Sequence, residues 1–269
     1  MNVLREGPNF LREVYEKKFL IYELTKRDFT QRYVGSFLGL FWAFLEPLAM
    51  MMIIWFVFSV GLRTRSGGDV PFVVYLLTGM VAYNFVNDAI SQSAGVIRSY
   101  AFLVQKANFR LSILPIVKIN SALLLHLVFV FIVLGIMLAS GILPSLYWLQ
   151  TLYYLAAVLF FILGTSWLLS ALEVFVKDIG PVVGILLRFA FWLTPIFWNI
   201  DMIPGRFQIF LKINPLFYIV QGYRESLIYK IPFWEHPLYA LYFWGLSSLI
   251  LIVGVIVFTR LRPHFADVI

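Results

Sequence analysis

Six long apolar runs dominate this 269-residue chain. A helix needs about 20 predominantly apolar residues to cross the hydrocarbon layer of a membrane. Unsatisfied backbone groups in lipid cost several kcal/mol, so each run must be a helix or part of a barrel, and these runs lack the alternation of a barrel strand. We therefore expect an all-α integral membrane protein with six transmembrane helices, at Phe37–Leu62, Pro71–Ile90, Ile116–Leu143, Leu146–Leu172, Ile179–Trp198 and Pro237–Thr259.

Composition agrees with this class. Hydrophobic residues make up 61% of the chain and charged residues 13%, with a mean hydropathy of +0.88, whereas a soluble domain is about half apolar and a quarter charged. The chain has no cysteine and its three histidines are far apart, so we expect no metal site. The net charge of +7 is explained by membrane topology and lipid headgroups, and we expect no nucleic-acid partner.

Lysine and arginine predict the orientation, because they gather in cytoplasmic segments. With the chain start inside the cell, the cytoplasmic segments hold fourteen of these residues and the opposite side holds six. The first 36 residues contain no apolar core of a cleaved signal peptide. We therefore expect both termini in the cytoplasm.

An amphipathic helix is predicted before the first span, over residues 8–24. Apolar side chains such as Phe10 and Phe19 fall on one face and charged ones such as Arg12 and Lys17 on the other. Such a helix would lie in the plane of the membrane interface. The alternative is an ordinary cytoplasmic helix packed on a partner.

The segment 199–236, between the fifth and sixth spans, is broken by prolines into apolar pieces of roughly 10 to 16 residues, a length typical of re-entrant or interfacial segments. We expect re-entrant helices that line an exit, against the alternative of a surface hairpin with no role in passage. Arg224 and Glu225 would either reach the outer surface or pair with groups in the bundle. The candidate exit residues are Asn214, Pro215, Tyr223, Arg224 and Glu225.

No nucleotide-binding loop, metalloprotease motif or nucleophile elbow is present. We therefore assign no catalytic residue and no cofactor to this chain. If ATP is used, another chain binds it. The chain would then be a passive channel, a secondary transporter or a subunit of a larger machine.

Two stretches resemble a known family. They are "LTPIFW…IP…NPLFYIVQGYRESLI", from Leu193 to Ile228, and "TKRDFTQRYVGSFLGLFWAFLEPL", from Thr25 to Leu48. They resemble the membrane subunits of ATP-binding cassette exporters for O-antigen, teichoic acid and related capsular polysaccharides, and the likeness covers nearly the whole chain. It implies a single permease domain over 1–269 in the cytoplasmic (inner) membrane. It also implies a homodimer that encloses a passage for a lipid-linked polysaccharide, with each copy bound to a soluble ATPase subunit that holds ATP and Mg.

The resemblance also implies that residues 98–112 form a coupling segment that docks into the ATPase. The residues agree with this role, because apolar side chains within a basic rim suit a protein groove. The alternative is a loop that rests on lipid headgroups. The candidate coupling residues are Tyr100, Phe102, Leu103, Lys106 and Arg110.

The first span carries an apolar, mostly aromatic face with heptad spacing. One interpretation is a rail along which sugar rings stack, and the other is a helix–helix seam, which the same spacing predicts. The candidate passage residues are Phe37, Phe41, Phe44, Trp55 and Phe58.

Charged residues near and within the spans give three further hypotheses. Lys26, Arg27 and Arg32 either capture the diphosphate of a lipid-linked glycan or anchor the chain at the cytoplasmic surface. Glu46 and Arg188 lie inside spans, where charge is costly, and would face the bundle interior as a pair. His126 is interpreted as a structural histidine.

Two rival functions remain. The first is a drug or lipid exporter of the same layout, which only the cargo distinguishes. The second is a membrane enzyme acting on lipid-linked sugars, which needs convergent acids or bases. Glu46, Asp88 and Glu173 are too scattered in the sequence to suggest it.

Overall fold

A computed structural model describes residues 16–32, 39–63, 70–104 and 109–269, and within these ranges the regular structure is helical throughout. The α-helices are α2 (Lys18–Gln31), α3 (Trp42–Trp55), α4 (Phe72–Ala94), α5 (Val96–Ser99), α6 (Ala101–Val104), α7 (Ile113–Ala139), α8 (Gln150–Glu173), α9 (Ile179–Leu193), α10 (Gly205–Lys212), α11 (Pro215–Arg224), α12 (Pro237–Leu261) and α13 (Phe265–Val268). Short 3₁₀ turns precede α3, α8, α10 and α13, and π-helical turns extend α3 over Phe56–Gly61 and α11 over Glu225–Tyr229. The predicted all-α class is confirmed.

Five helical stretches are long and apolar enough to cross a membrane: Trp42–Gly61, Phe72–Ala94, Ile113–Ala139, Leu146–Glu173 and Pro237–Val268. They correspond to five of the six predicted spans. The remaining one, Ile179–Trp198, is helical only as α9, whose 15 residues extend about 22 Å. Its last residues leave the helix because Pro195 disfavours helical backbone at Thr194.

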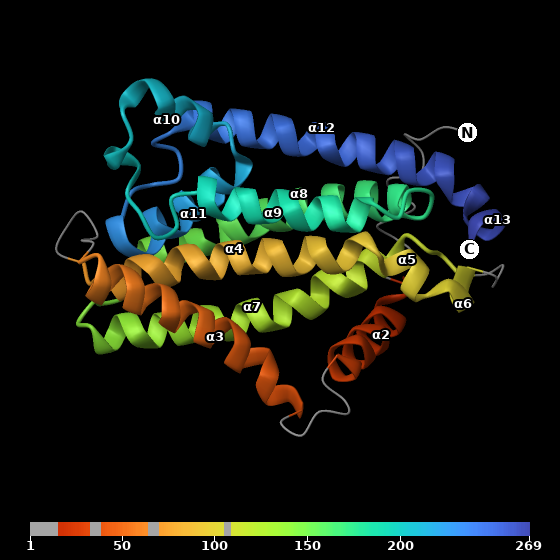
Figure 1. The fold of residues 1–269 in the computed structure, drawn as a ribbon, viewed down its shortest axis with the longest axis horizontal. Coiled ribbons are helices and arrows are strands. Elements are labelled where there is room, and N and C mark those ends of the chain that lie inside the picture. Colours follow the sequence, from red (N-terminus) through yellow and green to blue (C-terminus); the bar gives the residue numbers. More distant parts are fainter. Residues whose placement is uncertain (1–15, 33–38, 64–69, 105–108) are drawn as a thin grey trace.

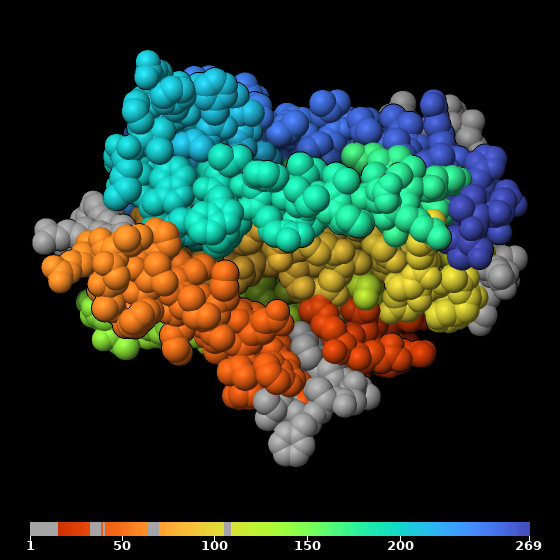
Figure 2. Space-filling model, in the orientation of Figure 1, coloured from red at the N-terminus to blue at the C-terminus, as the bar shows by residue number. Residues whose placement is uncertain are grey.

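α4 is the central helix of the bundle (Figure 1). It packs against α3, α7, α8, α9 and α11, and 78% of its most apolar stretch is buried. Small residues such as Gly79, Ala82 and Ala89 allow this crowding, because they let neighbouring helices approach closely. α3 and α9 stand out as two ridges on one face of the molecule, with α4 recessed between them (Figure 2).

The two ends of the bundle differ in kind. α5, α6 and α13 lie at one end, while α10 and the segments flanking α11 lie at the other (Figure 1). α9 runs alongside the long helices between these ends. The predicted coupling segment and exit segment therefore lie at opposite ends.

The described helix before the first span differs from the one predicted over 8–24. Residues 8–15 lie outside the described part, and α2 continues to Gln31. α2 packs on α7 through Ile21, Thr25 and Asp28, which share one face. The buried Asp28 forms an ion pair with Lys118 of α7. A polar contact with the bundle therefore fixes α2, while apolar Phe19 points away and is exposed.

Two glycines bring α8 and α12 into backbone contact. A Cβ atom on Gly254 of α12 would lie 2.5 Å from the carbonyl oxygen of Gly164 in α8, and one on Gly164 would lie 2.7 Å from the Cα of Leu251. Without a hydrophobic driving force in lipid, such close packing is a main source of helix association.

We predict that Gly254→Ala lowers the free energy of unfolding by about 1–3 kcal/mol, because the added methyl forces α8 and α12 apart. Gly245→Ala in the same helix is the matched control, since a Cβ there meets nothing within 4 Å. Unfolding in detergent, followed by tryptophan fluorescence, measures both. Equal stability of the two variants would contradict the packing argument.

Candidate functional site

The end of α9 is fastened to the start of α11. Thr194 has extended backbone before Pro195, which ends α9. Asn214 caps α11: its side-chain oxygen accepts a hydrogen bond from the Leu216 N–H at 3.0 Å, and Pro215 occupies the first turn. The Asn214 amide donates to the Thr194 hydroxyl at 2.8 Å. The two proline breaks thus form one structural unit.

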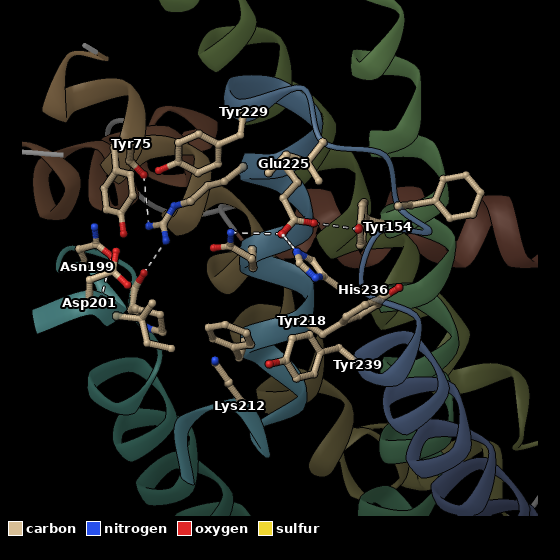
Figure 3. A pocket seen from close by; sticks show the side chains of 17 residues that line it. Tyr75, Tyr154, Asn199, Asp201, Lys212, Tyr218, Glu225, Tyr229, His236 and Tyr239 are labelled. Carbon is tan, nitrogen blue, oxygen red and sulfur yellow. Dashed lines mark hydrogen bonds and ion pairs between the residues drawn. The ribbon is translucent and has the colours of Figure 1, made fainter. Parts of the chain in front are cut away.

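Arg224, in the last turn of α11, holds the broken end of α9. Its side chain is fully enclosed, since the residue is 1% exposed. Nη1 donates to the carbonyl oxygen of Pro195 at 2.6 Å, and Nη2 donates to those of Ile196 at 2.6 Å and Tyr75 at 3.3 Å (Figure 3). The guanidinium carbon lies 3.6 Å from the centroid of the Tyr75 ring. We call Arg224, these three carbonyls and this ring the arginine clasp.

The positive charge of Arg224 is compensated by backbone carbonyl dipoles rather than by a carboxylate. No carboxylate pairs with Arg224 within the part of the chain that the structure describes. A buried charge requires hydrogen bonds to compensate its desolvation, and those to charged groups contribute about 1.5–3 kcal/mol each. A desolvated cation over an aromatic ring contributes about 2 kcal/mol more. Of the two possibilities that the sequence left open for Arg224, it does not reach the outer surface and instead pairs with groups in the bundle.

Glu225 is the next residue but faces another side of α11. Its carboxylate accepts from the Gln221 amide at 3.2 Å and from the Tyr154 hydroxyl at 3.5 Å, and His236 Nε2 lies at 3.5 Å. Burial raises the pKa of Glu225, and the Gln221 hydrogen bond, then His236 and Tyr154, oppose that rise. Glu225 thereby ties α11 to α8 and to the loop that precedes α12.

Tyr223 faces a third direction, toward α7. Its hydroxyl lies 2.9 Å from His126 Nε2 in the buried interior, and the His126 ring stacks on Phe85 at 4.5 Å between centroids. The interpretation of His126 as a structural histidine agrees with this geometry.

A cavity of about 540 Å³, which we call the α11 cavity, adjoins these residues (Figure 3). α11 forms one wall. The others come from α4, α8, the turn after α9, the end of α10 and the residues around the start of α12. Its lining combines aromatic rings with polar groups: Tyr75, Tyr154, Asn199, Asp201, Lys212, Phe217, Tyr218, Gln221, Arg224, Glu225, Tyr229, Phe233, His236 and Tyr239, with Pro195, Ile200 and Ile231.

A second cavity of about 640 Å³, the α3 cavity, lies between α3, α4 and α7. Its polar lining is unusual for the interior of an apolar bundle and comprises Arg32, Glu46, Asn84, Asn87, Asp88, Gln92 and His126. Arg32 and Asp88 form an ion pair at 3.1 Å across it. Polar side chains at membrane depth usually face a cavity or a substrate path.

Glu46 and Arg188 do not form the predicted pair within one chain. Glu46 lines the α3 cavity, whereas Arg188 lies on the outer face of α9 and donates to the Gly184 carbonyl of its own helix at 3.1 Å. Both are exposed in the single chain rather than turned into the bundle interior. The separation of α3 and α9 into two ridges keeps them apart.

The three basic residues proposed for diphosphate capture are divided by the structure. Lys26 and Arg27 are exposed on α2. Arg32 is turned toward the bundle, where Asp88 accepts two of its N–H groups. A diphosphate held by all three would have to compete with this carboxylate.

The aromatic face of α3 is partly a seam. Phe44 packs near Phe129, with 6.2 Å between ring centroids, and Phe58 packs on Phe197 at 4.6 Å. Phe41 and Trp55 remain exposed, and Phe37 lies outside the described residues. The seam interpretation therefore fits Phe44 and Phe58, while a passage role for Phe41 and Trp55 stays a prediction.

Within the predicted coupling segment, some side chains contact the bundle and others are exposed. Leu103 is buried, while Phe102 is 55% exposed. Tyr100 donates to Asp28 of α2 at 3.2 Å, and burial, followed by the Asp28 charge, raises the pKa of Tyr100 to about 12. Arg110 is half-buried, and Lys106 lies outside the described part. Of the described apolar side chains, Phe102 is the one best placed to enter a partner groove.

A second anchor comes from a residue that the sequence analysis did not single out. Arg98 donates to the carbonyl oxygens of Glu173 and Val174, where α8 ends. A displacement of the coupling segment would therefore pull on α8 as well as on α2.

We predict that Arg224→Lys destabilises the protein by about 3 kcal/mol, because an ammonium cannot present the planar fork that reaches several carbonyls. Arg206→Lys, on the exposed surface of α10, is the control and should leave stability unchanged. The unfolding temperature in detergent and the yield of folded protein measure the effect. An Arg224→Lys variant as stable as the wild type would show that the arginine clasp does not contribute to stability.

The amino-acid sequence can be compared with those of known proteins. The sequence profile described as "ABC-2 type transporter" matches residues 20–228, most of the chain. An O-antigen export system permease protein RfbA of Klebsiella pneumoniae is 27% identical over 251 residues, which cover 93% of this chain and 95% of that protein. The RfbA protein of Myxococcus xanthus is 26% identical over 263 residues, 96% and 98% of the two chains. A polysialic acid transport protein KpsM of Escherichia coli is 24% identical over 217 residues, 79% and 82% of the two chains. The chain described above belongs to the ABC-2 type transporter family.

Proposed function

We propose that this chain is the transmembrane subunit of an ATP-driven exporter that moves a lipid-linked, O-antigen-like polysaccharide across the cytoplasmic membrane. The observation that carries the proposal is the match to O-antigen export permeases over almost the full length of both chains. The match includes the segments that build the arginine clasp. The permease does no covalent chemistry, and ATP and Mg belong to a separate ATPase subunit.

The recessed surface of α4 supports a polymer passage between two copies. α3 and α9 form ridges on either side of α4 (Figure 2), and α4 contributes Asn84, Asn87, Asp88 and Gln92 to the α3 cavity. Amide and carboxylate groups suit hydroxyl-rich cargo, because amides donate and accept hydrogen bonds and carboxylates accept them. A second copy facing these ridges would close the recess into a passage.

The polar lining favours sugar cargo over the two rivals. A passage for apolar drugs or lipids has no need of the amides on α4. An enzyme needs free acids at one depth, but Asp88 is paired with Arg32 and Glu173 with Arg98. Asp88 and Glu173 are thus engaged in ion pairs, and Glu46, which shares the α3 cavity with Asp88, has no second unpaired acid of these three beside it.

ATP binding in the partner would act through the coupling segment. Closure of two ATPase subunits would press on Phe102 and its neighbours. The contacts of Tyr100 with α2 and of Arg98 with the end of α8 would then pass that displacement into the bundle. The glycan would move outward first and its lipid anchor would follow.

We predict that deletion of this gene strands lipid-linked glycan in the cytoplasm and that the wild-type chain with its ATPase restores surface glycan. Surface staining and extraction of lipid-linked intermediates measure both pools. Normal surface glycan in the deletion strain would refute the proposed cargo. Stranded drug in place of glycan would support the rival exporter.

Variants in the same strain test the coupling segment. Phe102→Ala should abolish rescue and release the ATPase during purification, because an apolar side chain in a protein groove is a typical interface anchor. Phe210→Ala is the control, since Phe210 is an exposed phenylalanine on α10 at the other end. Rescue by Phe102→Ala with a bound ATPase would place the contact elsewhere.

We also propose that α9, with the chain to Trp198, makes a sixth crossing and that 199–236 returns to the outer face, which leaves both termini in the cytoplasm. Support comes from the arrangement of the ends: α2 and α13 lie toward the coupling end, and α10 lies at the other (Figure 1). Burial of α11 among α4, α8 and α12 supports a re-entrant position for it, whereas α10, with no buried residue, fits the surface alternative.

The absence of cysteine makes this topology directly testable. We predict that Arg206→Cys reacts with a membrane-impermeant maleimide in intact spheroplasts, because α10 lies outside. Arg262→Cys, after α12, should react only after the membrane is opened. Labelling of Arg262→Cys in intact spheroplasts would place the chain after α12 on the same outer side as α10 and would contradict the proposed topology.

A further inference from the structure

The α11 cavity is a built chamber that the proposed passage between two copies does not use. It lies at the α10–α11 end, and its walls are formed by α4, α8, α10, α11 and the start of α12 (Figure 3). Its volume of about 540 Å³ falls within the range of small-molecule sites. We propose that it is a saccharide-binding site that holds one or two neutral sugar rings. This inference rests on the proposed export of polysaccharide.

The aromatic side chains of the chamber are held rigidly. Tyr218 stacks on Phe243 at 4.7 Å between centroids, and its hydroxyl lies 3.0 Å from that of Tyr153. Phe233 stacks on Tyr153 at 4.5 Å. Because each ring is packed against the protein on one side and also lines the cavity, it offers a fixed apolar surface. Such surfaces pack against the C–H faces of pyranose rings, as they pack against other flat groups.

Polar groups on the rim are placed for hydroxyl groups. Lys212 of α10 and Asp201 of the turn after α9 stand on opposite sides of the chamber from the Tyr154 and Glu225 pair (Figure 3). Asp201 accepts hydrogen bonds, and Lys212 donates them. At the base, Arg224 is fully buried, and its Nε has no hydrogen-bond partner among the described residues. The chamber thus offers both donors and acceptors beside ring surfaces.

The balance of charge selects a neutral ligand. Two acids, Asp201 and Glu225, and two bases, Lys212 and Arg224, line the chamber with His236. Arg224 is already committed to three carbonyls and Glu225 to Gln221, Tyr154 and His236. A phosphate would meet the two carboxylates, and a lipid tail would leave the rim polar groups unpaired, which is costly. A neutral sugar is not repelled by the carboxylates, and its hydroxyl groups form hydrogen bonds with the polar groups of the rim.

Saturation-transfer NMR on the full chain with its ATPase in lipid nanodiscs tests the site. The probes are methyl α-D-mannopyranoside and methyl α-D-glucopyranoside, with open-chain sorbitol as a probe that has hydroxyl groups but no ring face. We expect transfer from protein aromatic protons to the ring C–H protons of at least one pyranoside and none to sorbitol. Equal transfer to all three, or to none, would overturn the proposal.

Matched variants locate the binding. Tyr239→Leu and Lys212→Ala, both on the rim, should weaken pyranoside binding about tenfold, the loss of roughly one stacked ring or one charge-assisted hydrogen bond. Tyr147→Leu is the control, because Tyr147 lies outside the cavity and is exposed. Melting temperatures confirm that each variant is folded, and an equal effect of all three would overturn the assignment to this cavity.

Export assays separate this inference from the proposed function. If the wild-type chain exports glycan but shows no transfer to a pyranoside, the saccharide site is wrong and the exporter stands. If deletion of the gene leaves surface glycan unchanged, the exporter itself is wrong, whatever the chamber binds.

Discussion

A single buried guanidinium determines how the turn after α9 and α11 are assembled. Proline breaks α9 before it is long enough to cross a membrane by itself, and the break leaves backbone carbonyls that no helix turn can satisfy. Arg224 satisfies those of Pro195 and Ile196 from a helix almost thirty residues later. In lipid an unpaired carbonyl costs several kcal/mol, so the break in α9 and the position of α11 depend on each other.

This dependence explains why the two motif segments occur together. Thr194 with Pro195 ends one helix, and Asn214 with Pro215 begins another; their side chains meet at 2.8 Å. Arg224 then closes the loop from the other end of α11. Both ends of the ten-residue helix α11 are attached to the residues that directly follow α9, which defines the orientation of α11 as well as its position.

Apolar run length and proline position were sufficient to predict the helical class, five of the six expected spans and the start of α11, but the run expected to be a span to Trp198 is helical only to Leu193. They could not predict the partners of Arg224, because backbone carbonyls have no signature in a sequence. The Glu46–Arg188 pair does not form within one chain for a related reason. Both charges lie in apolar runs, but which way a helix turns them depends on packing against α4, which a run of apolar residues on all sides does not specify. The packing of Phe44 on Phe129 and of Phe58 on Phe197, with Phe41 and Trp55 left exposed, likewise depends on tertiary contacts that the spacing alone does not specify.

Three consecutive residues attach α11 to three different parts of the bundle. Residues along an α-helix are turned by about 100° from one to the next, so Tyr223 faces α7, Arg224 faces α4 and α9, and Glu225 faces α8 and the loop before α12. α11 therefore cannot shift alone without breaking a buried polar contact. α7 begins directly after the predicted coupling segment and reaches Tyr223 through His126. A displacement at the start of α7 can thus reach α11 through one continuous helix.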